Sequence, residues 1–589
     1  MKGSGLSKDQ IRVDSLWPFD PGYLAVAFFA VVLGIPSLLY PFGFDQSNQA
    51  FIATRLMEGD TLFSDVACLK PPLPIYFHLL SLKLFGRDMA SVRLLDMAWT
   101  ALICLSLHRF CLAAFGERGR WMGILSGLFY AHFYYTHRFW HSAQTDGWLN
   151  LPVVLAMALV VSTLENKDEK GDKGVFAKWL LIGLLSDCAL LFKYSAAGFP
   201  AFFLMAALLY LFKGGAGGRY ALGGLLTGLA AGGAVFVLWL WSTGGLAGFV
   251  GGHLSDVLAY GTKSIQSGVA PKDSGSPMSL IKRLFTFSQG YDRLKGSPGS
   301  FLFGAGGAVF ALFSVVSFSK RRAQWILVFI WFLAAWFSTA VQARWFPYHY
   351  LPVLAPWAIF AAYFIYTLFR ITGIFIDSLP LRFFPIALLT VYAMFSMPLF
   401  PSHGYISPSV QLMMLEGYLF EGNTRLSLWK SGAFEVSRNF SVKETIAVAD
   451  YLNANSSPDD SMFVWGSDMA IYFLVPRPRV TKIDSSFQAS GLVVSPPCAA
   501  PGSLRTDFEK NPPELFILQE GDQIPHILGN KMDSKAMFLE NKEIFSFISD
   551  RYTEEAKVER FTIYRLRKNP LPQSVGKTGE RAISGGLKG

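Results

Sequence analysis

The sequence predicts a polytopic α-helical membrane protein that ends in an extracytoplasmic α/β domain. Of its 589 residues, 52% are hydrophobic and only 16% are charged, whereas charged residues make up about 25% of a typical soluble domain. The mean hydropathy is positive, at +0.35. The apolar residues are gathered in stretches that approach the ~20 residues needed to cross a bilayer. These observations exclude a set of soluble domains, a disordered chain and a fibrous protein.

Net charge and cysteine content exclude other classes. The formal net charge is +10, but the basic residues fall in short clusters between apolar runs, where orienting charges of membrane proteins lie. They form no single basic face, so we expect no nucleic-acid partner. The five cysteines include no CxxC pair and no metal-ligand spacing. We therefore expect neither a zinc site nor a disulfide framework.

Charge-poor stretches predict the transmembrane helices. We expect eleven of them, at residues 21–40, 94–115, 121–137, 147–164, 178–192, 194–212, 220–242, 301–319, 323–341, 348–369 and 383–400. Residues 73–86 are too short to span, and His78 and Lys83 suit a helix that lies at the membrane interface. The transmembrane domain is thus expected to occupy residues 21–400.

The distribution of Lys and Arg predicts the orientation. If residues 1–20 are cytoplasmic, the inner loops are about twofold richer in Lys and Arg than the short outer segments, as the positive-inside rule requires. No small-residue cleavage site follows the first apolar run, so we expect it to be retained as a helix. The outer loops 41–93 and 243–300 and everything after residue 400 would then share the outer face of a cytoplasmic (inner) membrane. The second of these loops is long enough to cover a site.

The composition changes after residue 400. Residues 401–567 predict an extracytoplasmic (periplasmic) α/β domain with an amphipathic helix at 442–455. Its remaining elements are a short helix at 468–475 and strands at 461–466, 514–519 and 559–567. Residues 568–589 are typical of a disordered tail.

The first outer loop contains candidate catalytic groups. Asp45 directly follows the first helix and would be able to accept a proton from a hydroxyl as a general base. Arg55 and Lys70 lie in the same loop, and two cations near a carboxylate suit a phosphate leaving group. Two prolines follow Lys70 and restrict the backbone where it returns to the membrane. The alternative is that each charge simply marks the membrane interface.

The second outer turn adds a second carboxylate on the same face. Asp146 follows Arg138 and His141, and two acidic side chains from successive outer loops would be able to share one site. The alternative role for Asp146 is to cap the helix that follows. His132 and His137 lie in or near an apolar run and are expected to be packed histidines.

Two later turns complete the set of candidates. Lys193 lies in a hairpin between two apolar stretches, and we expect Asp187 to neutralise it locally. The last outer turn presents Arg344, His349 and Tyr350, which would serve equally in an interfacial aromatic belt.

Five segments in this order resemble the GT-C glycosyltransferases, specifically the bacterial branch related to protein O-mannosyltransferases and lipid A aminoarabinose transferases. The segments are FDQSNQAFIATRLMEGD, KPPLPIYFHLLSLKLFG, HRFWHSAQTDGWLN, LLFKYSAAGFP and RWFPYHYLPVLAP, and a similar outer α/β tail follows them. The resemblance covers residues 20–565.

The resemblance implies a polyprenyl-phosphate-linked sugar donor, used on the outer leaflet by an inverting direct displacement. Asp45 matches the catalytic base, and Asp146 matches a second acid that positions the acceptor or the base. The basic residues that match donor-phosphate positions, strongest first, are Arg55 and Lys70, then Arg138, Arg344 and His349. Further candidates are His141, Lys193 and Tyr350.

Two departures from the family pattern bear on the substrate. Many relatives have an acidic pair at the first motif, where this chain has Asp45-Gln46. Aminoarabinose transferases have an acidic residue before the lysine, where this chain has Cys68-Leu69-Lys70. Both weigh against a metal ion at this place, and the second weighs against aminoarabinose as the transferred sugar.

The sequence thus predicts a membrane glycosyltransferase that uses a lipid-linked donor and a glycolipid, glycan or protein hydroxyl as acceptor. We expect no cofactor, although Asp45 and Asp146 would suit a divalent ion if they converged. No nucleotide-binding motif is present in the sequence. The alternatives are a lipid or glycan transporter or flippase with an extracytoplasmic cap, which would favour internal repeats and broken helices, and a non-catalytic scaffold.

Overall fold

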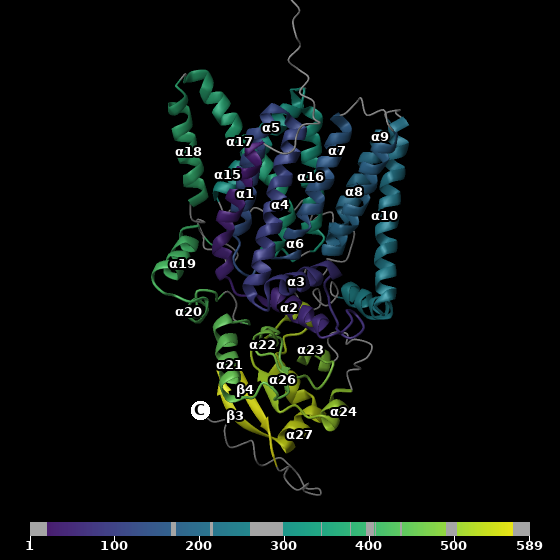
Figure 1. Ribbon diagram of the computed structural model, residues 1–589, viewed down its shortest axis with the longest axis vertical. Helices are drawn as coiled ribbons and strands as arrows, with labels where there is room; N and C mark the ends of the chain where they lie inside the picture. Colours follow the sequence, from purple (N-terminus) through teal and green to yellow (C-terminus); the bar gives the residue numbers. More distant parts are fainter. Residues whose placement is uncertain are drawn as a thin grey trace, which may run out of the picture.

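The computed structural model describes residues 20–568 except 166–171, 213–215, 260–297, 318, 343, 377, 396–405, 407, 436–438 and 491–502. Figure 1 shows a bundle of long helices above a small α/β domain, with short helices between them. Lys568 excepted, the predicted tail 568–589 lies outside the described residues.

Each of the eleven predicted apolar stretches overlaps a helix, although residue 318 of stretch 301–319 and residues 396–400 of stretch 383–400 lie outside the described residues. The long helices are α1 (Pro21–Gly34, continued by η2, Ile35–Leu39), α4 (Met89–Phe115), α5 (Glu117–Tyr135), α7 (Asn150–Glu165), α8 (Asp172–Phe192), α9 (Gly198–Phe212), α10 (Ala216–Ser242), α15 (Pro298–Val316), α16 (Arg322–Ala340), α17 (Leu354–Phe375) and α18 (Leu379–Phe395). Within the described residues, eight helical segments are both long and apolar enough to cross a membrane. α5, α15 and α18 are outside that set, so a count of eleven spans stays a prediction. The fold class itself, a multi-pass helical membrane protein with a C-terminal sheet, is confirmed.

Small residues allow two of the long helices to approach closely. α8 and α10 run side by side, and a Cβ atom added at Gly183 or Gly228 would overlap backbone atoms of the other helix. Such contacts between backbones are a common means of packing helices in lipid, where no hydrophobic effect draws them together.

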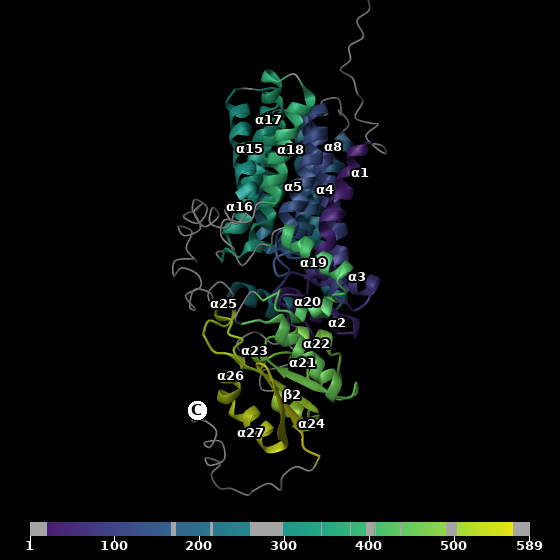
Figure 2. The same ribbon diagram turned by 90° about the vertical axis from the view of Figure 1, so that its left-hand side faces the viewer.

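Short elements cover the lower end of the bundle. α2 (Phe44–Met57) and α3 (Pro72–Phe85) lie across it, between the long helices and the α/β domain (Figures 1 and 2). α3 is the segment predicted to lie at the interface, and proline at its first position suits a helix start. The other short elements at this end are α6 (Thr145–Trp148), η3 (Tyr194–Ala197), α11 (Leu246–Gly248), η4 (Phe249–His253) and η5 (Pro347–Val353).

The C-terminal sheet has four strands in the order β1-β2-β4-β3. The strands are β1 (Met462–Trp465), β2 (Leu515–Gln519), β3 (Tyr552–Val558) and β4 (Phe561–Leu566). β1 and β2 are parallel, whereas β4 is antiparallel to both β2 and β3. Three strands match predicted ones. β3 was not predicted, because its centre is polar and exposed, as is typical of an edge strand.

Helices cover both faces of this sheet. Val464 and Ile517 pack in one cluster with Leu452 of α21 (Val442–Asn455), whereas Phe463 and Phe516 pack in another cluster. Successive strand residues point to opposite faces, so alternate side chains of β1 and β2 build two cores. The helices on the second face are α24 (Ser503–Lys510), α26 (Ser534–Glu540) and α27 (Lys542–Arg551).

The α/β domain sits on α2 and α3 through α22 (Ala470–Leu474). Tyr472 stacks on Phe51 of α2, with ring centroids 5.0 Å apart. Arg87, just after α3, donates hydrogen bonds to the carbonyl oxygens of Tyr472 (2.8 Å) and Phe473 (3.2 Å). The remaining connection passes through α19 (Pro408–Phe420) and α20 (Arg425–Lys430), and α23 (Ser486–Ala489) and α25 (Pro525–Leu528) complete the domain.

Candidate active site

Four charged side chains from four separate segments meet at the lower end of the bundle. Asp45 lies in the first turn of α2, and Lys70 lies just before α3. Asp146 belongs to α6, and Lys193 connects α8 to η3. The two carboxylates predicted from separate outer loops are therefore brought to one place.

These side chains form two ion pairs in a largely buried setting. Lys70 Nζ lies 3.0 Å from Asp45 Oδ1, and Lys193 Nζ lies 2.9 Å from Asp146 Oδ2. The Asp146 side chain has no exposed surface, and Gln342 donates a hydrogen bond of 2.9 Å to its other oxygen. No side chain of the four is more than 21% exposed.

The two pairs act on each other electrostatically. Burial acts to raise the pKa of Asp45, but the neighbouring Lys70, with a smaller effect from Lys193, holds that pKa below its ordinary value. Burial acts to lower the pKa of Lys70, and the carboxylates of Asp45 and Asp146 overcome this and raise it. For Lys193, burial and the charge of Lys70 prevail over Asp146, so its pKa is lowered. We therefore treat the four residues as one charge cluster.

Aromatic and basic groups from the segments before α17 and before α6 border the charge cluster. The Lys193 ammonium lies 5.8 Å from the centroid of the Tyr348 ring. His141 stacks on the same Tyr348 ring, with ring centroids 5.9 Å apart. His349 is buried beside Tyr348, with ring centroids 4.6 Å apart. Arg344 is an electrostatic neighbour of both, and its burial lowers its own pKa to about 10. Predicted residues His141, Arg344 and His349 thus lie at the edge of the cluster.

Gln46 joins the two loops that carry the carboxylates. Its fully buried amide nitrogen donates to three carbonyl oxygens of the second loop, those of Phe139 (3.0 Å), Trp140 (3.1 Å) and Ser142 (2.8 Å). Its side-chain oxygen accepts the Gly43 N–H at 3.1 Å. A carboxylate has no proton to donate here, so the Asp45-Gln46 departure in the sequence has a physical reason.

Two buried charges within α4 were missed by the sequence analysis. Arg93 donates to the carbonyl oxygens of Pro41 and Phe139, both at 2.8 Å, and so braces the same two loops. Asp96 accepts hydrogen bonds from the Tyr134 hydroxyl (2.6 Å) and the Trp148 indole (2.7 Å). Charges inside an apolar stretch were the available signal, because such residues are costly without partners.

Three predicted residues have contacts with groups that do not belong to the charge cluster. Arg55 is ten residues along α2 from Asp45, which places it about 15 Å along the helix axis. Arg138 donates instead to the Ala433 carbonyl oxygen at 3.2 Å. The ring of Tyr350 packs against the rings of Trp336 and Trp345.

The predicted pairing of Lys193 with Asp187 is wrong. Lys193 pairs with Asp146, and Asp187 instead faces α10, where its carboxylate lies against Gly232. Residues three or four apart share a helix face, whereas these two are six apart and Lys193 lies beyond the end of α8. The backbone of Lys193 is extended and leads from α8 into η3.

Metal binding finds no support in the arrangement of the described ligand residues. Among them, no group of three or more His, Cys, Asp or Glu side chains is placed to hold a metal ion. The partners of Asp45 and Asp146 are lysines.

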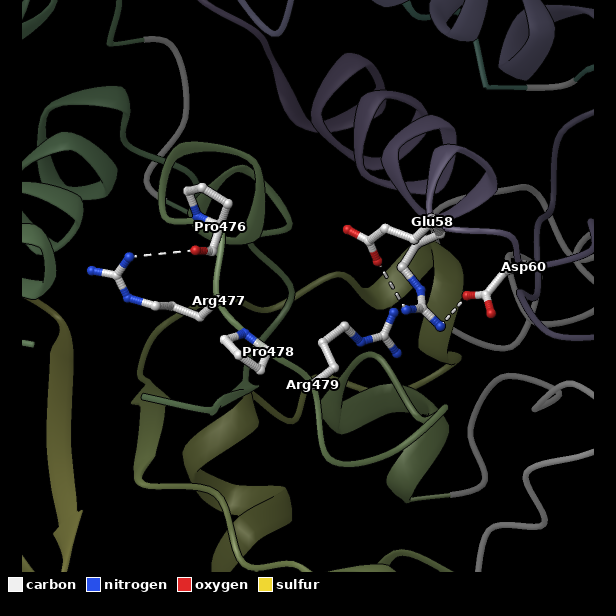
Figure 3. A pocket seen from close by; sticks show the side chains of 7 residues that line it. Glu58, Asp60, Pro476, Arg477, Pro478 and Arg479 are labelled. Atoms are coloured by element: carbon white, nitrogen blue, oxygen red, sulfur yellow. Dashed lines mark hydrogen bonds and ion pairs between the residues drawn. The ribbon is translucent and has the colours of Figure 1, made fainter. Parts of the chain in front are cut away.

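A second charged region lies where α2 ends against the α/β domain. A hollow of about 450 Å³ is lined by Arg55, Glu58, Asp60 and residues 476–479. In Figure 3, Arg479 points toward Glu58 and Asp60, whereas Arg477 points away from them. Arg55 pairs with Glu58 and Asp60. Arg479 pairs with Asp484 and lies over the Phe51 ring. Arg55 and Arg479 therefore already have carboxylate partners of their own.

The comparisons with known proteins agree with this architecture. Residues 69–241 match the family described as dolichyl-phosphate-mannose-protein mannosyltransferase. No curated protein sequence matches the chain. The chain is similar to the crystal structure of ArnT from Cupriavidus metallidurans bound to undecaprenyl phosphate, with a TM-score of 0.58 and 15% identity over 94% of this chain and 100% of that one. For the apo state of the same protein the TM-score is 0.54, with 14% identity over 92% and 96%.

At this level of identity the structural likeness concerns the fold, and the matched family segment contains three of the four residues of the charge cluster. The chain thus has the fold of these solved structures, and its residues 69–241 match the mannosyltransferase family.

Proposed function

We propose that the chain transfers a sugar from a polyprenyl-phosphate-linked donor to an acceptor hydroxyl at the outer face of the cytoplasmic membrane. The observation that carries this proposal is the meeting of two Asp–Lys pairs, from four distant segments, in one buried place at the end of the bundle. The solved relative that holds undecaprenyl phosphate has the same fold, which supports the class of donor. The acceptor is a glycolipid, a glycan or a protein.

The two lysines suit the phosphate of the donor. Lys70 and Lys193 each pair with one carboxylate of the charge cluster, and the charge of each lysine is felt within that cluster. Charge-assisted hydrogen bonds to phosphate oxygens are strong in a buried site. They grow stronger as negative charge develops on a departing phosphate. Arg344 extends this positive region at its edge, and the buried ring of His349 lies beside it as a hydrogen-bonding group.

Asp45 suits the role of general base. In the proposed step the acceptor oxygen attacks the anomeric carbon while the bond from that carbon to the phosphate oxygen breaks. The electron pair leaves with the polyprenyl phosphate, and the acceptor proton passes to Asp45. When Lys70 turns toward the phosphate, Asp45 loses part of the charge that lowers its pKa, and it becomes a stronger base at the moment of transfer.

Asp146 suits a positioning role. It is fully buried, and its two oxygens accept from Lys193 and Gln342. We propose that it holds Lys193 toward the donor and leaves proton transfer to Asp45. Arg55 and Arg138 have no place in this site, because they lie elsewhere and have other partners.

The test is release of undecaprenyl phosphate by the purified full-length chain from a panel of undecaprenyl-phosphate-linked sugars. Asp45→Asn should lower kcat by a factor of about 10²–10⁴, the usual contribution of a general base, while binding of undecaprenyl phosphate is retained. Asp65→Asn is a matched control, because Asp65 lies in the same loop but pairs with Lys482. Full turnover by Asp45→Asn would exclude Asp45 as the base.

A further inference from the structure

His253 joins the two chain segments that carry the lysines of the charge cluster. It is the last residue of η4, in the described beginning of the outer loop 243–300, and is only 4% exposed. Its Nδ1 lies 2.6 Å from the carbonyl oxygen of Cys68, and its Nε2 lies 2.8 Å from the hydroxyl of Tyr194. Cys68 is two residues before Lys70, and Tyr194 directly follows Lys193.

The chemistry of the two contacts assigns the protons. A carbonyl oxygen only accepts hydrogen bonds, so Nδ1 of the neutral ring carries the proton and donates a hydrogen bond to the Cys68 carbonyl oxygen. Nε2 is then the acceptor, and the Tyr194 hydroxyl donates to it. Both ring nitrogens are thus used in fixing the two segments to each other.

Packing holds the imidazole in this position. The ring lies 4.6 Å from Phe63 and 5.2 Å from Phe249, measured between centroids. A Cβ atom at Gly248 would overlap the Phe63 carbonyl, so the segment lies directly on the first outer loop. The Ser64 hydroxyl donates a hydrogen bond of 2.6 Å to the Gly244 carbonyl oxygen, which is a second connection between the first loop and the segment that carries His253.

We infer that His253 is a positioning residue that sets the separation of Lys70 and Lys193. Each lysine is paired with a carboxylate from yet another segment, and in the described residues His253 is the side chain that bridges the segments of the lysines directly. The Lys70 end of this bridge is itself short and stiff, because the Lys70 N–H donates to the Cys68 sulfur at 3.3 Å and two prolines follow.

This inference rests on the proposed function, since the lysines are taken to bind the donor phosphate together. If their spacing relaxes, a phosphate is able to engage one lysine fully and the other poorly. The affinity for the donor then falls, and the rate of the chemical step falls too, because the same contacts grow stronger as the phosphate departs. The signature of a positioning role is therefore a higher Kd for undecaprenyl phosphate together with a lower kcat/KM.

The experiment measures undecaprenyl phosphate binding and donor KM for the full-length chain with His253→Ala, Tyr194→Phe and both together. Loss of one hydrogen bond predicts about tenfold weaker binding for each single variant. Because both residues act through one bridge, the double variant should bind undecaprenyl phosphate no more weakly than the single variant with the lower affinity. Tyr194→Phe removes one hydroxyl and keeps the ring, so it tests the inference even if His253→Ala does not fold.

Two controls separate the possible failures. His108→Ala removes another buried histidine, which faces Asp20 at the opposite end of α1, and should leave binding of undecaprenyl phosphate unchanged. If Lys70→Met and Lys193→Met bind undecaprenyl phosphate as tightly as the unaltered chain, the proposed function fails. If these lysine variants bind weakly but the His253 and Tyr194 variants bind normally, or their effects add, the inference about His253 is overturned.

Discussion

The two ends of α2 carry charges that are arranged in opposite ways. At its start, Asp45 pairs with Lys70, which lies just before α3. This pair lies beside a second pair, Asp146 and Lys193, from two other loops. At its end, Arg55 pairs with Glu58 and Asp60, its own near neighbours in the sequence. Charges that are satisfied by local partners stabilise a loop and leave little for a ligand. Charges brought together by the tertiary fold create a field that a ligand is able to use.

The largest expected contrast is in turnover. Lys70→Met and Lys193→Met should each lower kcat/KM by a factor of about 10²–10³, because each removes a cation that stabilises the departing phosphate. Arg55→Met should change kcat/KM by less than about threefold, since Arg55 lies about 15 Å along α2 from Asp45 and pairs with Glu58 and Asp60 rather than with the charge cluster. Release of undecaprenyl phosphate by the three purified variants measures this.

Equal losses in all three variants would remove the distinction between the two ends of α2. Lys482→Met, which alters the region around Arg55 without touching α2, is a further control. It should behave as Arg55→Met does.

The next contrast is in the pH dependence. Lys70 holds the pKa of Asp45 below its ordinary value, so in the free protein Asp45 stays ionised until the pH falls below about 4. Lys70→Met removes that cation, which raises the pKa of Asp45 and moves the acid limb of kcat/KM to higher pH. The pH profile of the residual activity measures the shift, with Arg55→Met as the variant whose acid limb should stay in place. An unchanged limb in Lys70→Met would show that Asp45 does not titrate in the reaction.

The smallest expected effect on activity comes from the α/β domain. Burial raises the pKa of Asp468 from 3.8 to about 6. Its folded pKa exceeds its unfolded one, so its contribution to stability is present below pH 4 and is lost as the pH rises through 6. Asp468→Asn should therefore make the domain more stable than the unaltered one by about 2 kcal/mol at pH 8, with no difference near pH 4 and unchanged turnover.

Hydrogen exchange of the β1 and β2 amides in the full-length chain measures this local stability. A variant that is less stable at every pH would show that the two hydrogen bonds of the carboxylate, from Thr445 and from the Ala470 N–H, outweigh the cost of its burial.

The fold was predictable because its signals are local. An apolar stretch is helical in lipid whatever its neighbours are, and each of the eleven predicted stretches overlaps a helix. Strands β1, β2 and β4 have apolar runs and were predicted. The centre of β3 is polar and exposed, and β3 pairs at the edge of the sheet, so its sequence contains no apolar run.

The site was predictable only in part, because partners chosen by the tertiary fold leave no trace in local sequence. Asp45, Lys70, Asp146 and Lys193 were all candidates from their positions in the loops and turns between apolar stretches. The partner of Lys193 was predicted wrongly, since Asp187 is near in sequence but Asp146 is near in space. Arg55 and Arg138 are positively charged, as Lys70 is. They lie outside the site because of the directions in which α2 and the loop before α6 run.

The most direct test of the central claim is an experimental structure of the full-length chain with bound undecaprenyl phosphate. We expect the phosphate between Lys70 and Lys193, with both ammonium groups within hydrogen-bond distance of its oxygens and Asp45 beside it. A phosphate found in the hollow lined by Arg55 and Arg479, with both Asp–Lys pairs of the charge cluster unchanged, would contradict the account.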